Sequence, residues 1–300
     1  MPKCAKHTGC NFFKPTPRLK SRLGFSDDLQ TLQTIRKIMK KTIIAAVLTL
    51  LAAHAAAQRV VILTPDVADI AAKLGADKEV VGIHEFNRNP AYKNTPSIGF
   101  YRNFSAEPII AKKPDLVIGS WMAKPDGIYA QLSRAGVKAE NVNSNETLEQ
   151  YQQSFARIGK LLGKEKQAQA LAQQFKNSIK AQPANGKRYI LSYDGRYVAG
   201  KNTVGDVLIR LAGGTNAAAS VDGLKPFSRE GWLNAKPDVI IIAKHNEKAL
   251  GGLDKIMTRP EIASSPAGKN KRILFWQADY YMRYGLYTPD IIRKLHDLGK

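Results

Sequence analysis

Cysteine is scarce in this 300-residue chain, and its two copies, Cys4 and Cys10, both lie within the first ten residues. The rest of the chain therefore has no thiol and cannot form a disulfide. Its stability must come from packing, and 300 residues are enough for two domains that each have a core of their own.

Signatures of catalysis are also missing. The sequence has no G-x-x-x-x-G-K-[ST] loop, no G-x-G-x-x-G after a strand and no G-x-S-x-G elbow. Beyond residue 57 it has only three histidines, His84, His245 and His296. A zinc or manganese site usually has three or four His, Asp or Glu ligands. We therefore expect no catalytic residue and no catalytic cofactor. An exported enzyme and a carrier of bare metal ions are the less favoured alternatives.

Charge of one sign is abundant but not clustered. The net charge is +21, yet no run of Lys and Arg is longer than two residues. A basic excess is typical of proteins that bind nucleic acid, anionic lipid or an anionic ligand. The chain has no zinc-finger spacing and no RNA-binding aromatic motif, which disfavours nucleic acid as a partner.

The one long apolar run is too short to cross a bilayer, which takes about 20 residues. It covers Thr42 to Ala53, follows the basic Met39-Lys40-Lys41 and precedes three alanines ending at Ala57. This pattern predicts a signal peptide over 39–57 and a periplasmic protein. Residues 1–38 are then an upstream extension that is disordered or not native, and the exported chain carries a net charge of about +13.

The sequence contains an internal repeat, with its two copies 123 residues apart. FSAEPIIAKKPDLVI at 104–118 matches FSREGWLNAKPDVII at 227–241, and the shared positions include Phe104/Phe227, Ser105/Ser228, Glu107/Glu230, Lys113/Lys236, Pro114/Pro237 and Asp115/Asp238. A match at a fixed offset indicates one architectural unit used twice. Each copy reads as a helix start capped by serine, a Lys-Pro-Asp turn and a buried strand.

The remaining periodicities predict α/β units. Short β-branched runs indicate strands over 59–63, 79–83, 116–119, 189–193, 239–243 and 272–276, while helical spacing appears over 128–134, 147–162, 164–181, 204–211 and 290–298. We predict two Rossmann-like lobes, over 58–163 and 183–300, joined by a long linking helix over 164–182, with a ligand cleft between the lobes.

Ligands of open α/β sheets bind beyond the carboxyl ends of the strands. The residues just past each predicted strand are therefore the candidates for a binding site. They are His84, Phe100, Tyr101, Arg102, Trp121 and Lys124 in the first half, and Tyr193, Arg196, Lys244, His245, Tyr280, Tyr281, Met282, Arg283, Tyr284 and Tyr287 in the second. Aromatic walls with a few cations suit a large, flat, anionic ligand.

Three stretches resemble the substrate-binding proteins of ABC importers for iron chelates, haemin and cobalamin, and the haemin-binding branch in particular. They are IGFYRNFSAEPIIAKKPDLVIGS, RLAGGTNAA and SPAGKNKRI, and the resemblance extends over Arg59 to Leu298. It implies an exported, monomeric binding protein that delivers haem to an ABC permease at the inner membrane. A carrier of a ferric siderophore, another iron chelate or cobalamin is the alternative within the same class.

The resemblance breaks at the residue expected to bind iron. The branch reads G-Y-x-R-x-L-S-A-E with a tyrosine that can ligate haem iron, but here Phe100 stands in its place and Tyr101 follows one residue later. Either Tyr101 substitutes, or His84, Tyr193 or His245 ligates the iron, or the ligand is not haem. The motif G-P-R-T-P of the branch reads Gly-Leu-Tyr-Thr-Pro at 285–289, so an arginine is lost that Arg283 can replace.

Cations are expected to meet the carboxylates of the ligand, and the candidates are Arg102, Arg196, Arg229 and Arg283. In the family, one exposed carboxylate on each lobe pairs with arginines of the permease. Glu107 and Glu230 occupy the matching positions in the two copies of the repeat.

Overall fold

The computed structural model describes residues 36–37, 39 and 58–300. The predicted extension over 1–38 and the signal peptide over 39–57 fall almost wholly outside these residues and stay predictions. From residue 58 to the C-terminus the chain forms one compact unit.

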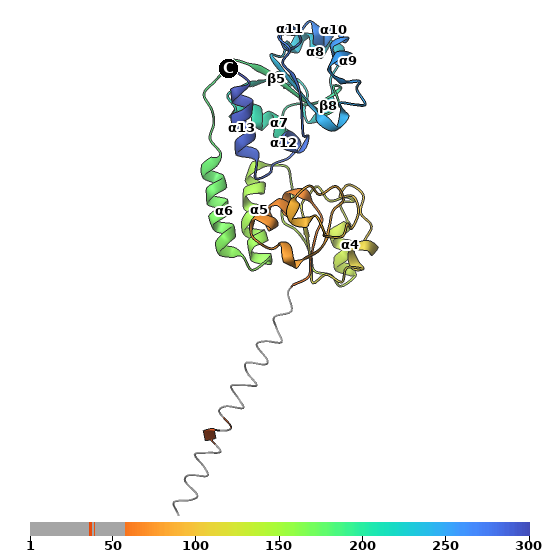
Figure 1. Ribbon diagram of the computed structural model, residues 1–300, viewed down its shortest axis with the longest axis vertical. Coiled ribbons are helices and arrows are strands. Elements are labelled where there is room, and N and C mark those ends of the chain that lie inside the picture. The colour runs from red at the N-terminus through yellow and green to blue at the C-terminus, as the bar shows by residue number, and fades with distance from the viewer. Residues whose placement is uncertain (1–35, 38, 40–57) are drawn as a thin grey trace, which may run out of the picture. The chain divides into compact units, whose positions relative to one another are not determined.

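Two separate sheets organise this unit (Figure 1). The first is parallel, has the order β2-β1-β3-β4 and is formed by β1 (Val60–Ile62), β2 (Val80–Ile83), β3 (Leu116–Gly119) and β4 (Ala139–Asn141). The second has the order β10-β9-β5-β6-β8 and is formed by β5 (Arg188–Ser192), β6 (Tyr197–Ala199), β8 (Leu224–Pro226), β9 (Val239–Ala243) and β10 (Ile273–Trp276), with β7 (Thr215–Asn216) beside β5. Strands β10, β9 and β5 run parallel to one another, whereas β6 pairs antiparallel with both β5 and β8. The predicted class, two α/β lobes, is confirmed.

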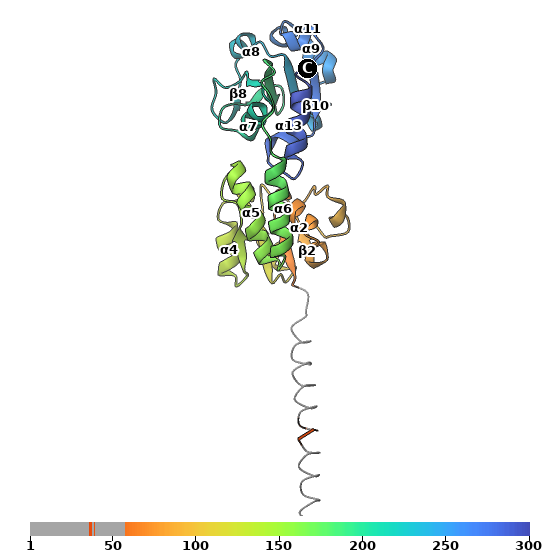
Figure 2. The same cartoon turned by 90° about the vertical axis from the view of Figure 1, so that its left-hand side faces the viewer.

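Helices cover both sheets. Those of the first lobe are α2 (Pro65–Lys73), α3 (Glu107–Ile110), α4 (Ile128–Arg134), α5 (Leu148–Leu161) and α6 (Glu165–Ser178). Those of the second are α7 (Val204–Leu211), α8 (Arg229–Ala235), α9 (Gly252–Met257), α10 (Pro260–Ala263), α11 (Pro266–Lys269), α12 (Asp279–Met282) and α13 (Thr288–Asp297). In both views α5 and α6 lie side by side along the first lobe, and α13 lies beyond their ends on the second (Figures 1 and 2).

The repeated Lys-Pro-Asp turn has the same geometry in both lobes. Lys113 and Lys236 both adopt left-handed backbone conformations, with φ of 47° and 43°. In each turn the aspartate Oδ2 accepts a backbone N–H at the start of the first strand of its lobe, both at 2.8 Å. Asp115 accepts from Arg59, directly before β1, and Asp238 accepts from Arg188, the first residue of β5. The internal repeat seen in the sequence is therefore a repeated structural unit.

The helix starts of the repeat differ. The Ser228 hydroxyl accepts the N–H of Gly231 at 3.0 Å and caps α8, as predicted. The predicted cap by Ser105 is wrong, because α3 begins only at Glu107 and Ala106 occupies its N-cap position without a side-chain bond. Pro108 in the first turn of α3 supplies no N–H to cap.

The linking element also differs from the prediction. Helix α6 ends at Ser178, and the chain then runs without regular structure to β5. This segment binds the second lobe through its backbone, since Gln182 donates to the Leu211 carbonyl at 2.8 Å and Asn185 to the Gly213 carbonyl at 2.9 Å. The helix ends where Ile179, at its C-cap, takes an extended conformation with φ −77° and ψ 102°.

One apolar core runs through both lobes. Alternate residues of β1 (Val60, Ile62) and of β9 (Val239, Ile241) belong to the same cluster, which includes Tyr151 of α5. The opposite faces of the sheets have cores of their own, one per lobe. The strands are therefore buried on both faces, as parallel strands usually are.

The left-handed lysine of the second turn predicts a stabilising substitution. A non-glycine residue at positive φ destabilises the folded state by about 1–2 kcal/mol relative to glycine. Glycine loses more conformational entropy on folding, which offsets about 0.5–1 kcal/mol of the gain from replacing that residue. We therefore expect Lys236→Gly to raise the free energy of unfolding by about 0.5–1 kcal/mol in urea denaturation, while Lys236→Ala, which keeps a Cβ, gives no gain. A glycine variant less stable than the alanine variant would contradict this.

Candidate functional site

Segments that follow strands and helices of the two lobes contact each other through their side chains. Arg88, past the end of β2, donates to the side chain of Gln277, the residue directly after β10. Arg283, past the end of α12, bonds to Asp69 of α2. The carboxyl ends of the strands in the two lobes thus face the same region, where the sequence predicts the ligand.

His84 lies just past β2 and is 3% exposed. Its Nδ1 donates to the Glu85 carbonyl at 2.8 Å, so in the neutral ring Nε2 accepts from the Asn87 amide at 2.9 Å. Burial, with a smaller effect of the Arg283 charge, lowers the pKa of His84 from 6.5 to about 4. The imidazole is neutral at pH 7 and both of its nitrogens are used, which argues against the alternative that His84 ligates iron.

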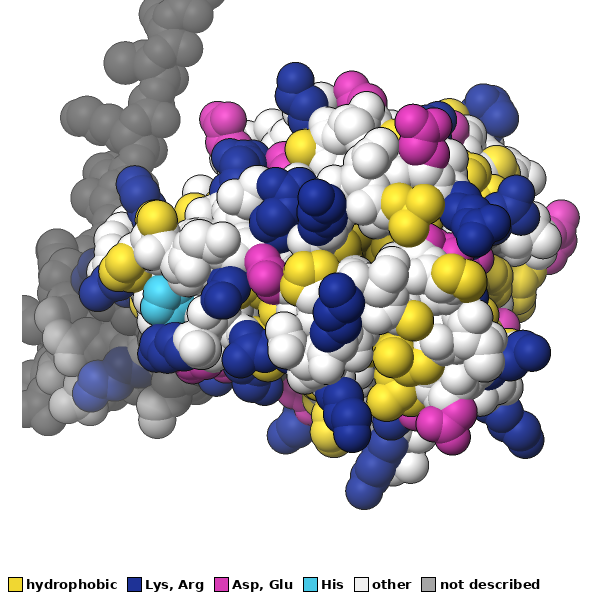
Figure 3. All heavy atoms as spheres, turned by 90° about the horizontal axis from the view of Figure 1, so that it is seen from above, with side chains coloured by type: hydrophobic (Ala, Val, Ile, Leu, Met, Phe, Trp, Pro, Cys, Tyr) yellow, Lys and Arg dark blue, Asp and Glu magenta, His cyan; other side chains and the backbone are white. Residues whose placement is uncertain are grey.

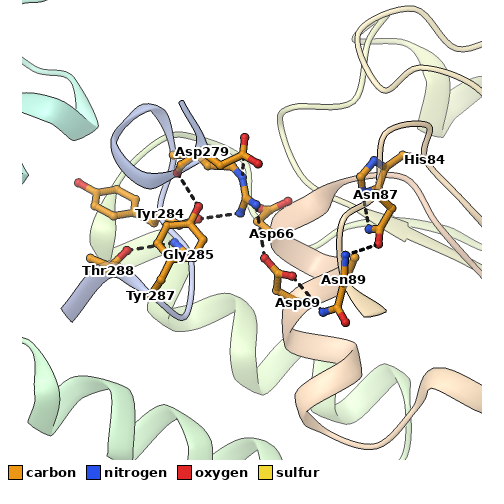
Figure 4. Close-up of polar contacts among 12 residues, drawn as sticks. Asp66, Asp69, His84, Asn87, Asn89, Asp279, Tyr284, Gly285, Tyr287 and Thr288 are labelled. Carbon is orange, nitrogen blue, oxygen red and sulfur yellow. Dashed lines mark hydrogen bonds and ion pairs between the residues drawn. The ribbon is translucent and has the colours of Figure 1, made fainter. Parts of the chain in front are cut away.

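A chain of polar contacts continues from His84 into the other lobe (Figure 4). The Asn87 Oδ1 accepts the N–H of Asn89 at 2.9 Å, and the Asn89 amide donates to Asp69 Oδ1 at 3.1 Å. Arg283 Nη2 donates to the other oxygen of Asp69 at 3.4 Å. Burial raises the pKa of Asp69, and the charge of Arg283 and the bond from Asn89 partly offset it.

Arg283 is held on several sides. Its side chain is 8% exposed and also pairs with Asp279 Oδ1 at 3.7 Å. The guanidinium lies 5.4 Å from the ring centre of Tyr287, whose hydroxyl donates to the Asp279 carbonyl at 2.5 Å. The sequence predicts that Arg283 meets a ligand carboxylate, but in the structure its partners are Asp69 and Asp279.

Four aromatic rings, of His84, Tyr101, Phe100 and Phe86, follow one another edge to face and are called here the aromatic row. Their successive centroid distances are 5.8, 5.1 and 6.0 Å. Phe86 is 71% exposed and has a φ of 61°, while Phe100 is 37% exposed. Tyr101 is half-buried against the core of its lobe, and the Arg102 guanidinium lies 5.5 Å from its ring. A phenylalanine at positive φ is an uncommon conformation that concentrates at functional sites.

A second aromatic group lies past the strands of the other lobe. Tyr193 follows β5 and His245 follows β9, and their ring centres are 5.1 Å apart. Arg196 is exposed and lies over the ring of Tyr197 at 5.9 Å.

The other predicted residues take varied positions. Trp121 is half-buried past β3, and its backbone N–H donates to the Asn143 carbonyl at 2.7 Å. Tyr284 is buried, 6.1 Å from Tyr151 in the shared core. Arg229 is exposed on α8 and pairs with Glu261 of α10 at 3.8 Å, so its observed partner is a carboxylate of its own lobe.

Sequence reasoning missed Glu146. It is half-buried in the segment between β4 and α5, and burial raises its pKa to about 7 although the charge of Arg102 opposes the shift. Burial, followed by the charge of Glu146, also raises the pKa of Tyr284, so Glu146 lies near both lobes. Glu146 follows β4, and β4 was not predicted. Had that strand been recognised, Glu146 would have been among the candidates past a strand end.

Glu107 is the first residue of α3, Glu230 the second of α8, and both are exposed. Figure 3 looks onto the end of the second lobe that carries α8 to α11. On this face Lys and Arg side chains are spread among acidic and apolar ones rather than gathered.

Within residues 36–37, 39 and 58–300, no cluster of three or more His, Cys, Asp or Glu is arranged to hold a metal ion. None of the helices described there combines the length and apolar character needed to span a membrane.

Residues 60–280 match the periplasmic binding protein family. The chain belongs to this family. Among solved structures, it is similar to the periplasmic heme-binding protein RhuT from Roseiflexus sp. RS-1, with 30% identity, a TM-score of 0.74 and coverage of 81% of this chain and 100% of that one.

Two curated relatives of this family member are more distant. An uncharacterized ABC transporter substrate-binding lipoprotein of Bacillus subtilis is 28% identical over 61% of this chain, and the match spans only 63% of the relative's length. The vitamin B12-binding protein of Yersinia pestis is 24% identical over 63% of this chain and 70% of its own length.

The low pKa of His84 predicts an acid-sensitive contribution to stability. Because the folded-state pKa lies below 6.5, the unfolded state binds more protons between pH 6.5 and about 4, so the contribution is present at neutral pH and lost as the pH falls. Between about pH 7.5 and pH 5, we expect the wild type to lose about 2 kcal/mol more stability than His84→Gln, whose amide does not titrate. Urea unfolding at both pH values measures this, and equal losses would rule out a neutral buried imidazole.

Proposed function

We propose that this chain is a periplasmic, monomeric binding protein that carries haem to an ABC permease of the inner membrane. The observation that carries the proposal is the aromatic row. It sets the exposed rings of Phe86 and Phe100 and the phenol of Tyr101 beside the cation of Arg102, where the ends of the two sheets meet.

Haem needs these three kinds of contact. Its flat apolar ring packs on aromatic faces, its carboxylates pair with arginine, and its Fe(III) accepts a phenolate. In this proposal Phe86 and Phe100 contact the ring, Arg102 meets a carboxylate and Tyr101 ligates the iron. Trp121 and Arg196 contact the ligand from the two lobes, and no catalytic step is involved.

The similarity to RhuT, named as a heme-binding protein, supports haem as the ligand, and the predicted signal peptide supports export. The alternative is a carrier of cobalamin, a ferric siderophore or another iron chelate. Two observations favour it: Phe100 stands where the haemin-binding branch has its tyrosine, and one relative is named as binding vitamin B12.

Titration of the purified protein separates these candidates. Haem binding produces a Soret band that saturates at a fixed stoichiometry, and cyanocobalamin or a ferric siderophore added at the same concentrations leaves the tryptophan fluorescence unchanged. Saturable quenching by cobalamin or by a siderophore, with no Soret change on haem addition, would overturn haem in favour of that ligand.

Tyr101→Phe tests the proposed iron ligand. The substitution removes only the phenolic oxygen, so we expect the absorption bands of a tyrosinate-bound ferric haem to vanish and the affinity to fall about tenfold or more, which is at least about 1.4 kcal/mol. Phe100→Tyr in the Tyr101→Phe background moves the phenol by one residue and serves as the matched control. A Tyr101→Phe spectrum identical to that of the wild type would remove Tyr101 from this role.

Glu107 and Glu230 are proposed to pair with arginines of the permease. Charge reversal of both, Glu107→Arg with Glu230→Arg, is expected to leave haem binding by the purified protein unchanged but to abolish growth of a deletion strain that has haem as its only iron source. Glu165→Arg, at an exposed first position of α6, is the control for charge reversal alone. Growth of the double variant at the wild-type rate would exclude this docking role.

A further inference from the structure

The loop over residues 84–89, which follows β2, supplies two of the four rings of the aromatic row. His84 at its start packs against Tyr101 at a centroid distance of 5.8 Å, and Phe86 packs against Phe100 at 6.0 Å. Phe86 is largely exposed and its φ is 61°, a conformation that residues with a Cβ seldom adopt. Because an exposed ring gains little from packing, contacts elsewhere must hold the loop in this conformation.

Side-chain amides fix the second half of the loop from within. The Asn87 amide donates to Nε2 of His84 at 2.9 Å, and the Asn87 Oδ1 accepts the N–H of Asn89 at 2.9 Å. The Asn89 Oδ1 accepts the N–H of Ala91 at 3.1 Å, at the start of the short helix Pro90–Tyr92. The amide nitrogen of Asn89 is therefore left to bond outside the loop.

Asp69 of α2 receives this amide and joins the loop to the other lobe (Figure 4). Its Oδ1 accepts from Asn89 at 3.1 Å, and its Oδ2 accepts from Arg283 Nη2 at 3.4 Å. Arg283 is also paired with Asp279 at 3.7 Å, which fixes it within the second lobe. Because each oxygen of Asp69 has a partner of its own, rotating the carboxylate would break both bonds. The loop that carries Phe86 is thus held from the second lobe through one carboxylate.

We propose that Asn89 and Asp69 are positioning residues of the haem site, which hold the loop over 84–89 in place for the ligand and do not contact it. This assignment rests on the proposed function. A loop that is ordered before the ligand arrives loses less conformational entropy on binding, which favours retention of the ligand. Arg283 takes part by orienting Asp69. This role accounts for an arginine that is expected at a ligand carboxylate and has two aspartates as its partners.

An exchange of the two side chains tests the bond between them. Asn89→Asp keeps the acceptor for Ala91 but sets two carboxylates against each other, so transfer of haem to apomyoglobin is expected to be about fivefold faster. Adding Asp69→Asn restores the bond in the opposite direction, because the introduced amide can donate from the Oδ1 position and still accept from Arg283 with its oxygen. The double variant is expected to lose haem within about twofold of the wild-type rate. Asn270→Asp, at an exposed position directly after α11, is the control for an added negative charge.

A Phe86→Ala background separates positioning from a general loss of stability. If the bond acts by holding the loop, Asn89→Asp has little further effect on haem loss once the Phe86 ring is absent, whereas a merely structural defect adds to it. In the ligand-free protein, hydrogen exchange of the backbone amides over 84–89 is expected to be faster in Asn89→Asp and to return to the wild-type rate in the double variant.

Three results would overturn the assignment: haem loss from Asn89→Asp at the wild-type rate, a double variant as fast as the single one, or additive effects of Asn89→Asp and Phe86→Ala. A wild type that binds no haem, with hydrogen exchange as expected, would overturn the proposed function instead.

Discussion

The apolar core shared by both lobes is the constraint on which the rest of this structure depends. Residues from β1 to α13 contribute to one continuous cluster, and Tyr151 of α5 meets Tyr284 of the second lobe within it. Separating the lobes would expose this surface, at a cost that grows by about 25 cal/mol for each Å² of apolar area. Large opening motions are therefore disfavoured, and the facing strand ends keep a defined spacing.

A largely buried ion pair at the edge of this core makes the contact between the two lobes specific in its orientation. Arg283 and Asp69 belong to different lobes and are both largely shielded from water, with exposed side-chain fractions of 8% and 24%. Removing one partner of such a pair leaves the other charge uncompensated, which is costly. Through Asn89 and Asn87 the pair connects to the ring of His84, against which Tyr101 packs. The contact between the lobes and the orientation of the aromatic row are thus parts of one network.

Much of this fold could be predicted from the sequence because its strands are short apolar runs and its helices have a single apolar face. The bounds of α4 and α7 agree with the prediction to the residue. Strands β4, β6 and β8 were missed, since each is only three residues long, and β4 and β8 also carry polar or proline residues. Arg283 was predicted to contact a ligand because it lies past a strand and can replace an arginine lost from the family motif. Its observed partner Asp69 lies 214 positions away, and no local pattern reveals a contact at that separation. The Tyr193–His245 contact depends on the neighbouring order of β5 and β9, which strand prediction alone does not provide.

The chain passes between the lobes once, through α6 and the segment after it, and this has a consequence for folding. Each sheet is made from consecutive residues, so the first lobe can assemble as soon as it emerges during synthesis or export. Tyr151 of α5 nevertheless gains its contact with Tyr284 only when residues near the end of the chain have been made. The apolar surface around Tyr151 therefore stays exposed to water until the second lobe has been made, and transiently exposed apolar surface of this kind is prone to aggregation.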